Sequence, residues 1–211
     1  VYCYARFIKR FTGHTAPWGT FVDIRTNIVQ VLQKQLKSEK YKKGRIFIGT
    51  VTDPYQPLER KYQLKRGILK ALQDYQPSVS ILTKSDLVLR DLDLLKQFKD
   101  IDVEFTVNTL DKKWKSLVEP NSVTVEQRLK AMKKLASQGI TVLVMMGPYW
   151  PIFTDPEALF KKFKEAGVSY VFTESLNTLG GNFDGVEKVL QKHYPHLLPK
   201  MKEILLSLIH I

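Results

Sequence analysis

The sequence predicts an α/β fold, a partial (β/α)6 TIM-like barrel of parallel strands built by a single domain over residues 1–211. Short apolar runs typical of strands alternate with amphipathic helical stretches five or six times, and this pattern requires parallel strands joined by right-handed crossovers. No Gly-x-Gly-x-x-Gly turn follows a predicted strand, which favours an incomplete barrel over a dinucleotide-binding sheet.

The beginning of the chain has the least regular pattern. Residues 1–20 carry many aromatic and basic side chains without a helical or strand period, which predicts a loop. Residues 21–24 alternate like a short strand, and Asn27 suits the N-cap of an amphipathic helix that follows. Residues 45–48 form an apolar run typical of a buried parallel strand, and the proline-containing stretch 49–59 predicts the loop after it.

The rest of the chain repeats a unit of one helix and one strand. Further strands are predicted at residues 79–83, 103–107, 140–146 and 170–173. Helices are predicted at residues 64–72, 91–98, 124–136, 155–163, 186–194 and 199–208. Thr124 and Gln127 have the spacing of a capping box, and Gly139 follows the end of that helix.

Composition bounds the class of protein. Hydrophobic residues make up 44% of the chain and charged residues 26%, which is typical of a folded domain. The apolar run 140–146 is too short to span a membrane, and we expect no signal peptide. One cysteine excludes a disulfide framework and predicts a reducing, cytoplasmic setting. The net charge of +12 comes from scattered lysines, which favours a solvated surface, with nucleic-acid binding as the alternative.

Polar side chains recur where the predicted strands end. These residues are Thr52, Asp53, Lys84, Ser85, Asn108, Glu119, Thr173 and Glu174. Strand ends and helix caps are normally polar, which explains any one of these residues taken alone. Because the carboxyl ends of barrel strands meet at one mouth, the recurrence in four or more units predicts a shared site there.

Several short motifs give the chain a family resemblance from Tyr2 to about Glu174. The motifs are Tyr2-Cys3-Tyr4-Ala5-Arg6, Gly13-His14, Pro17-Trp18-Gly19, Thr52-Asp53-Pro54-Tyr55-Gln56-Pro57-Leu58-Glu59, Thr83-Lys84-Ser85, Glu119-Pro120 and Arg128-Leu129. In combination they resemble radical S-adenosylmethionine (SAM) enzymes. More narrowly, they resemble the group related to spore photoproduct lyase, which is described as DNA-repair photolyase-like.

The resemblance implies a 4Fe-4S cluster and SAM as cofactors. In that family a Cys-x-x-x-Cys-x-x-Cys motif holds the cluster, and Cys3 matches its last cysteine. We therefore expect the chain to lack the N-terminal segment that carries the other two, since a single thiolate does not hold such a cluster. A cluster-free protein is the alternative. The family's reaction needs an electron donor and yields a 5′-deoxyadenosyl radical that abstracts hydrogen from a substrate.

The resemblance also implies which side chains contact SAM. Tyr2 packs near the adenine, Thr52 and Asp53 bind the amino group, Lys84, Ser85 and Asn108 reach the carboxylate or ribose, and Arg128 is a further candidate for the carboxylate. These assignments agree with the preference of an ammonium for carboxylate acceptors and of a carboxylate for lysine or arginine. No second cysteine follows Cys3, so the hydrogen donor of spore photoproduct lyase has no counterpart, and no catalytic residue is assigned.

Three classes of function therefore compete. The first is a radical SAM enzyme acting on an unidentified substrate, with a nucleic acid among the candidates. The second is a basic, nucleic-acid-binding protein related to repair, whose affinity would fall steeply with salt. The third is a barrel that binds a ligand without radical chemistry. We expect no membrane partner for any of them.

Overall fold

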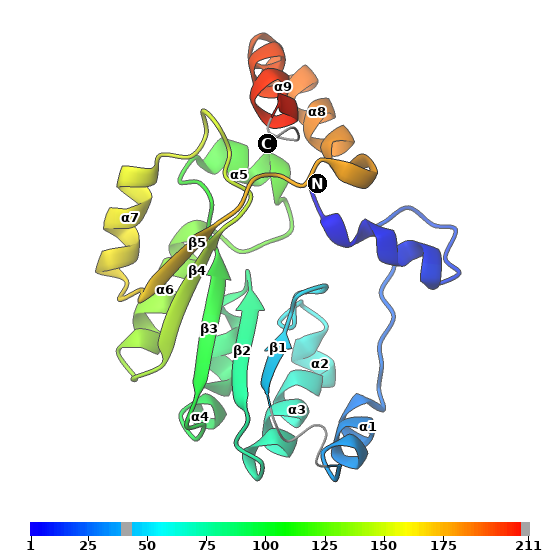
Figure 1. Cartoon of the computed structure of the whole chain (residues 1–211), viewed down its shortest axis with the longest axis vertical. Coiled ribbons are helices and arrows are strands. Elements are labelled where there is room, and N and C mark those ends of the chain that lie inside the picture. Colours follow the sequence, from blue (N-terminus) through cyan, green and yellow to red (C-terminus); the bar gives the residue numbers. More distant parts are fainter. Residues whose placement is uncertain (39–43, 208–211) are drawn as a thin grey trace.

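A parallel sheet of five strands forms the centre of the computed structural model, which describes residues 1–38 and 44–207 (Figure 1). The strands are β1 (Arg45–Ile48), β2 (Ser78–Thr83), β3 (Ile101–Thr106), β4 (Thr141–Met146) and β5 (Tyr170–Thr173). Their order in the sheet is their order in the chain, and every neighbouring pair is parallel. Within the described residues the sheet does not close, so the predicted α/β fold with a partial barrel is confirmed.

Helices connect the strands and extend the chain beyond them. The α-helices are α1 (Ile28–Gln35), α2 (Glu59–Tyr62), α3 (Leu64–Gln73), α4 (Leu92–Leu95), α5 (Lys112–Val118), α6 (Val125–Ala136), α7 (Pro156–Glu165), α8 (Asn182–His193) and α9 (Leu198–Ser207). The 3-10 helices are η1 (Tyr4–Phe11), η3 (Asp86–Asp91), η4 (Leu179–Gly181) and η5 (Pro195–Leu197). In the part of the chain that the structure describes, no helix combines the length and apolar character needed to cross a membrane.

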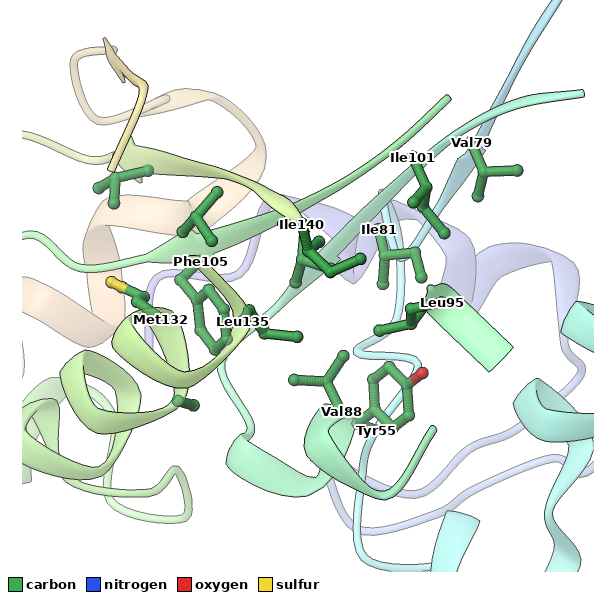
Figure 2. Packing of buried hydrophobic residues seen from close by; sticks show 14 of the residues in the cluster. Tyr55, Val79, Ile81, Val88, Leu95, Ile101, Phe105, Met132, Leu135 and Ile140 are labelled. Carbon is green, nitrogen blue, oxygen red and sulfur yellow. The ribbon is translucent and has the colours of Figure 1, made fainter. Parts of the chain in front are cut away.

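The main core lies between the sheet and the helices that cover one of its faces (Figure 2). Alternate residues of the central strands, such as Ile81 and Phe105, are buried there against Met132 and Leu135 of α6. The predicted capping box fixes the start of α6, because the Thr124 side chain accepts from the Gln127 N–H and the Gln127 side chain accepts from the Thr124 N–H.

A second apolar cluster lies beyond the carboxyl ends of the strands, where α5, α8 and α9 gather (Figure 1). Trp114 of α5 stacks on Phe153 with 3.9 Å between ring centroids, and its ring also meets the edge of Trp150 at 5.3 Å. Tyr2 packs against this cluster, with its ring 5.2 Å from that of Trp150. This packing holds the start of the chain over the carboxyl edge of the sheet.

Four predictions for the first half of the chain were wrong. Residues 4–11 form the 3-10 helix η1 rather than a loop, and residues 21–24 form no strand, since Phe21 stacks on His14 instead of pairing with the sheet. Strand β1 is parallel as predicted, but within the described residues it pairs with β2 alone, and its Phe47 side chain is exposed rather than buried. Asn27 precedes α1 without a capping bond from its side chain.

The predicted helices of the second half are confirmed with small shifts of their ends. Asp155 accepts from the Ala158 N–H at 3.0 Å, and Pro156 occupies the first turn of α7, as expected for a helix start. Leu208, the last residue of the final predicted helix, lies outside the described residues. Glu119 ends α5 rather than a strand, although its side chain still reaches the carboxyl edge of the sheet.

Candidate functional site at the carboxyl edge of the sheet

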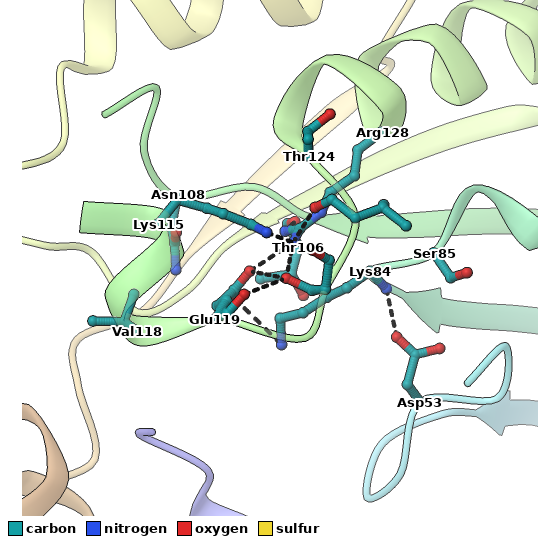
Figure 3. A network of polar contacts seen from close by, with 12 residues as sticks. Asp53, Lys84, Ser85, Thr106, Asn108, Lys115, Val118, Glu119, Thr124 and Arg128 are labelled. Atoms are coloured by element: carbon teal, nitrogen blue, oxygen red, sulfur yellow. Dashed lines mark hydrogen bonds and ion pairs between the residues drawn. The ribbon is translucent and has the colours of Figure 1, made fainter. Parts of the chain in front are cut away.

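A buried carboxylate, Glu119, organises the polar side chains at the carboxyl edge (Figure 3). Its Oε2 accepts from Arg128 Nη2 at 2.6 Å and from Ser122 Oγ at 3.1 Å. Its Oε1 accepts from the Tyr2 hydroxyl and lies 3.8 Å from Lys84 Nζ. Burial alone would raise the pKa of Glu119, but the charges of Lys84 and Arg128 and these hydrogen bonds lower it to about 2. The side chain is therefore an anion at neutral pH.

Arg128 is committed to contacts inside the chain. Its side chain is 1% exposed, and besides Glu119 its guanidinium donates to the Thr106 carbonyl at 2.7 Å and to Ser122 Oγ at 2.6 Å. The carboxylate that Arg128 binds is thus supplied by α5 rather than by a ligand. These contacts hold Glu119 and the end of β3, and the role of Arg128 toward the SAM carboxylate stays a prediction.

Lys84 is the cation of this group that is open to a ligand. It follows β2 directly, and a third of its side chain is exposed. Its Nζ lies 5.6 Å from the centroid of the Tyr2 ring, within the range of a cation–π contact. Burial, together with the neighbouring Glu119 carboxylate, raises the pKa of Tyr2 well above its ordinary value, so this hydroxyl stays protonated and donates.

Asp53 ties the loop after β1 to the end of β2. Its Oδ1 accepts from Thr83 Oγ1 at 2.7 Å and from the Tyr55 N–H at 2.9 Å, and its Oδ2 accepts from the Lys84 N–H at 2.7 Å. The loop approaches β2 so closely that a Cβ on Gly49 would lie 2.2 Å from the Leu82 carbonyl oxygen. A carboxylate has about four acceptor positions, so Asp53 keeps capacity for one more donor.

The other predicted residues lie around the same edge with less direct roles. Thr52 is exposed on the Asp53 loop, and Ser85 caps η3 by accepting from the Leu87 N–H at 3.2 Å. Asn108 is buried, and its side chain donates to the Gly147 carbonyl at 3.3 Å. The structure thus brings Tyr2, Lys84 and Asn108 close to Glu119. Asp53 joins this group by accepting a hydrogen bond from the Lys84 N–H.

Cys3 is a free, half-buried thiol next to Tyr2 at the start of η1. Among the described residues, no group of three or more His, Cys, Asp or Glu side chains is placed to hold a metal ion. A 4Fe-4S cluster takes three or four sulfur ligands, and these residues offer one. The described residues therefore offer one sulfur ligand, the Cys3 thiolate, and do not complete the ligand set of such a cluster.

Glu119 is the central residue of this group, and the sequence predicted no ligand contact for it. Its sequence signal is the pair Glu119-Pro120 at the end of a helix, nine positions before Arg128. That signal marks a polar turn, but it does not show that the carboxylate is 7% exposed and paired with an enclosed guanidinium.

Residues 1–163 match the model of the radical SAM superfamily, and the chain belongs to this family. It is 36% identical over 194 residues to an uncharacterized protein of Methanocaldococcus jannaschii, covering 92% of this chain and 71% of that protein. A spore photoproduct lyase variant with bound AdoMet and dinucleoside spore photoproduct has a similar fold, with a TM-score of 0.59 and 17% identity over 92% of this chain. SuiB of Streptococcus suis, bound to S-adenosylmethionine, gives a TM-score of 0.61 and 14% identity over 86% of this chain.

The chain spans 56% of that spore photoproduct lyase chain and 43% of the SuiB chain. At these levels of identity the two structures show a shared fold.

Proposed function

We propose that this chain is the SAM-binding part of a radical SAM enzyme, with SAM at the carboxyl edge of the sheet. One observation carries the proposal: Lys84 is a partly exposed cation held beside Glu119 and beside Tyr2, the residue directly before Cys3. Family membership supports it, since the matched residues include this whole group. The solved structures with bound SAM support it through their fold alone.

The side chains suit the charged ends of SAM. Lys84 can donate to the SAM carboxylate, while Thr52 and the remaining acceptor capacity of Asp53 suit its ammonium group. Asn108 and Ser85 suit the ribose hydroxyls or the carboxylate. Tyr2 offers a ring face for the adenine, and its hydroxyl bond to Glu119 fixes the orientation of that ring.

Glu119 and Arg128 have a positioning role in this proposal. A lysine next to an unpaired arginine would be pushed away by charge repulsion, whereas Glu119 lies between Lys84 and Arg128 and attracts both. The pair therefore places a cation where the carboxylate of SAM is expected. Cys3, directly after Tyr2, would supply one thiolate to a cluster, which needs further sulfur ligands besides it.

A bound, reduced cluster would supply the electron that splits SAM into methionine and a 5′-deoxyadenosyl radical, which takes a hydrogen atom from the substrate. The spore photoproduct lyase variant holds a dinucleoside spore photoproduct, which makes a nucleic acid one candidate class of substrate for this chain.

Calorimetric titration of SAM into the full-length protein tests the binding site. Replacing Lys84 by Met should weaken SAM binding about tenfold, because a charged hydrogen bond is worth roughly 1.5–3 kcal/mol. Lys70 is exposed on α3 and serves as the matched control, for which Lys70→Met should leave the affinity unchanged. Equal affinity of the two variants would contradict the assignment of Lys84.

Two other functions make different predictions in the same titration. A barrel that binds a ligand without radical chemistry would take up no cluster and would leave SAM intact under reducing conditions. A basic nucleic-acid-binding protein without a SAM site would give no heat with SAM, and its affinity for DNA would fall with salt. The net charge of +12 is the observation that favours the nucleic-acid-binding candidate.

A further inference from the structure

A cavity of about 350 Å³ lies between η1 and the turn that leads into α8, outside the group around Glu119. Figure 1 shows these segments side by side, η1 in blue next to the N label and the turn in orange before α8. The residues that line it are Tyr4, Arg6, Phe7, Arg10, Asn177, Leu179, Gly180 and Asn182. This lining contains two arginines, two asparagines and two aromatic rings, and it contains no carboxylate.

Two buried polar atoms at this cavity have no hydrogen-bond partner within the described residues. Asn182 is 3% exposed, and its Oδ1 accepts no hydrogen bond. Arg6 donates through Nη1 to the Gly181 carbonyl at 3.3 Å and through Nη2 to the Val1 carbonyl at 3.1 Å, but its buried Nε–H has no acceptor. Buried polar groups are nearly always paired. The unpaired Asn182 Oδ1 and Arg6 Nε–H therefore indicate a ligand that offers a donor to the first and an acceptor to the second.

The outer wall of the cavity provides stacking surface and positive charge together. The side chains of Tyr4 and Phe7 are about half exposed, at 47% and 49%. The Arg10 guanidinium carbon lies 5.8 Å from the centroid of the Phe7 ring and 4.6 Å from that of Phe11. Exposed rings next to arginines are the means by which proteins stack a base and neutralise its phosphate.

We propose that this cavity binds a nucleotide unit, with the base against Phe7 or Tyr4 and the phosphate at Arg10. The ring edge of a base offers donors and acceptors that satisfy Asn182 Oδ1 and Arg6 Nε–H. The ligand is either a free mononucleotide or one nucleotide of a single-stranded nucleic acid. The proposal goes beyond the SAM-dependent function, because this binding requires neither SAM nor a cluster.

The test measures binding of two probes to the full-length protein. Calorimetry follows AMP, and fluorescence anisotropy follows a fluorescein-labelled twelve-residue thymidine oligonucleotide. Phe7→Ala and Arg10→Gln should each weaken binding about tenfold, given the usual contribution of a stacked base or a charged phosphate contact. Phe160 on α7 is 49% exposed like Phe7, and Arg60 on α2 is exposed, so Phe160→Ala and Arg60→Gln are the matched controls.

The two probes distinguish the source of the nucleotide. Binding of the oligonucleotide with no measurable binding of AMP assigns the cavity to a strand, and the reverse assigns it to a free nucleotide. For the strand, Arg10→Gln should also reduce the slope of log affinity against log salt by about one.

Three outcomes would overturn the proposal. Neither probe binds, the test variants bind as tightly as their matched controls, or excess SAM displaces the bound probe. Displacement by SAM would show that the cavity belongs to the SAM site. Because these measurements use no reductant and no cluster, they can fail while SAM cleavage succeeds, and they can succeed while SAM cleavage fails.

Discussion

Removing the charge of Glu119 should destabilise the protein more than any other single loss of a carboxylate at the carboxyl edge. In Glu119→Gln the volume of the side chain is kept, but Arg128 stays enclosed, with its side chain 1% exposed and without an anionic partner. Breaking a buried ion pair from one side costs about 3–5 kcal/mol, since the remaining charge is left unpaired in a dry site.

The titration of Glu119 leads to a similar magnitude. Its pKa falls from an ordinary 4.5 to about 2 in the folded chain. At about 1.4 kcal/mol per pKa unit, this difference corresponds to roughly 3 kcal/mol of folding free energy at neutral pH. For a protein of this length, a loss of that size lowers the midpoint of thermal unfolding by roughly 6–12 °C.

Urea unfolding followed by circular dichroism measures the effect. Glu165→Gln is the matched control, because Glu165 is exposed on α7 and paired only with Lys162 at 3.0 Å, and its midpoint should stay within experimental error. The double variant Glu119→Gln/Arg128→Met removes both buried charges and should be more stable than Glu119→Gln alone. A single variant as stable as the control, or a double variant less stable than the single one, would refute the role given to this pair.

Three further predictions concern the same edge and its supports. The free energy of unfolding should fall by about 3 kcal/mol as the pH drops from about 5 to 2. The pKa of Glu119 is lower in the folded chain than in the unfolded chain, so its stabilising effect is complete above the unfolded pKa and is lost as the pH falls to the folded pKa. Glu119→Gln should flatten this part of the pH profile. Asp53→Asn should cost about 2 kcal/mol in urea unfolding, since an amide cannot accept from all three donors, whereas the exposed Asp74→Asn should change little. Thr124→Ala should cost about 1 kcal/mol by losing the capping box of α6, and an unchanged urea midpoint would contradict it.

Sequence pattern was sufficient for the elements that depend on local chemistry. The strands β2 to β5 are short apolar runs between turn residues, and the start of α6 depends on two side chains three positions apart. Such signals involve neighbours in the chain. The parallel sheet followed from the alternation of strands and helices, because that connection leaves few other topologies.

Pattern failed where the outcome depends on a distant partner. The apolar run of β1 is the same whether one or two strands flank it, and only the folded sheet shows that Phe47 faces away from the core. Residues 21–24 alternate as a strand does, but an alternating segment forms a strand only when a neighbour pairs with it.

The site shows the same division. The positions of Asp53, Lys84 and Asn108 after strands placed them at one edge in advance, because parallel strands end together. The periodicity of α6 could not distinguish Arg128 from the surface cations of that helix. Its guanidinium is buried through contacts with Thr106 and Glu119, which lie 22 and 9 positions away in the sequence.

Anaerobic reconstitution of the full-length protein with iron and sulfide, followed by reduction in the presence of SAM, tests the proposed enzyme class most directly. We predict about four irons for each chain, as in a 4Fe-4S centre, and release of 5′-deoxyadenosine that slows in the Lys84→Met variant but not in Lys70→Met. A protein that takes up the cluster, binds SAM and releases no 5′-deoxyadenosine under reduction would contradict the assignment of this chain to radical chemistry.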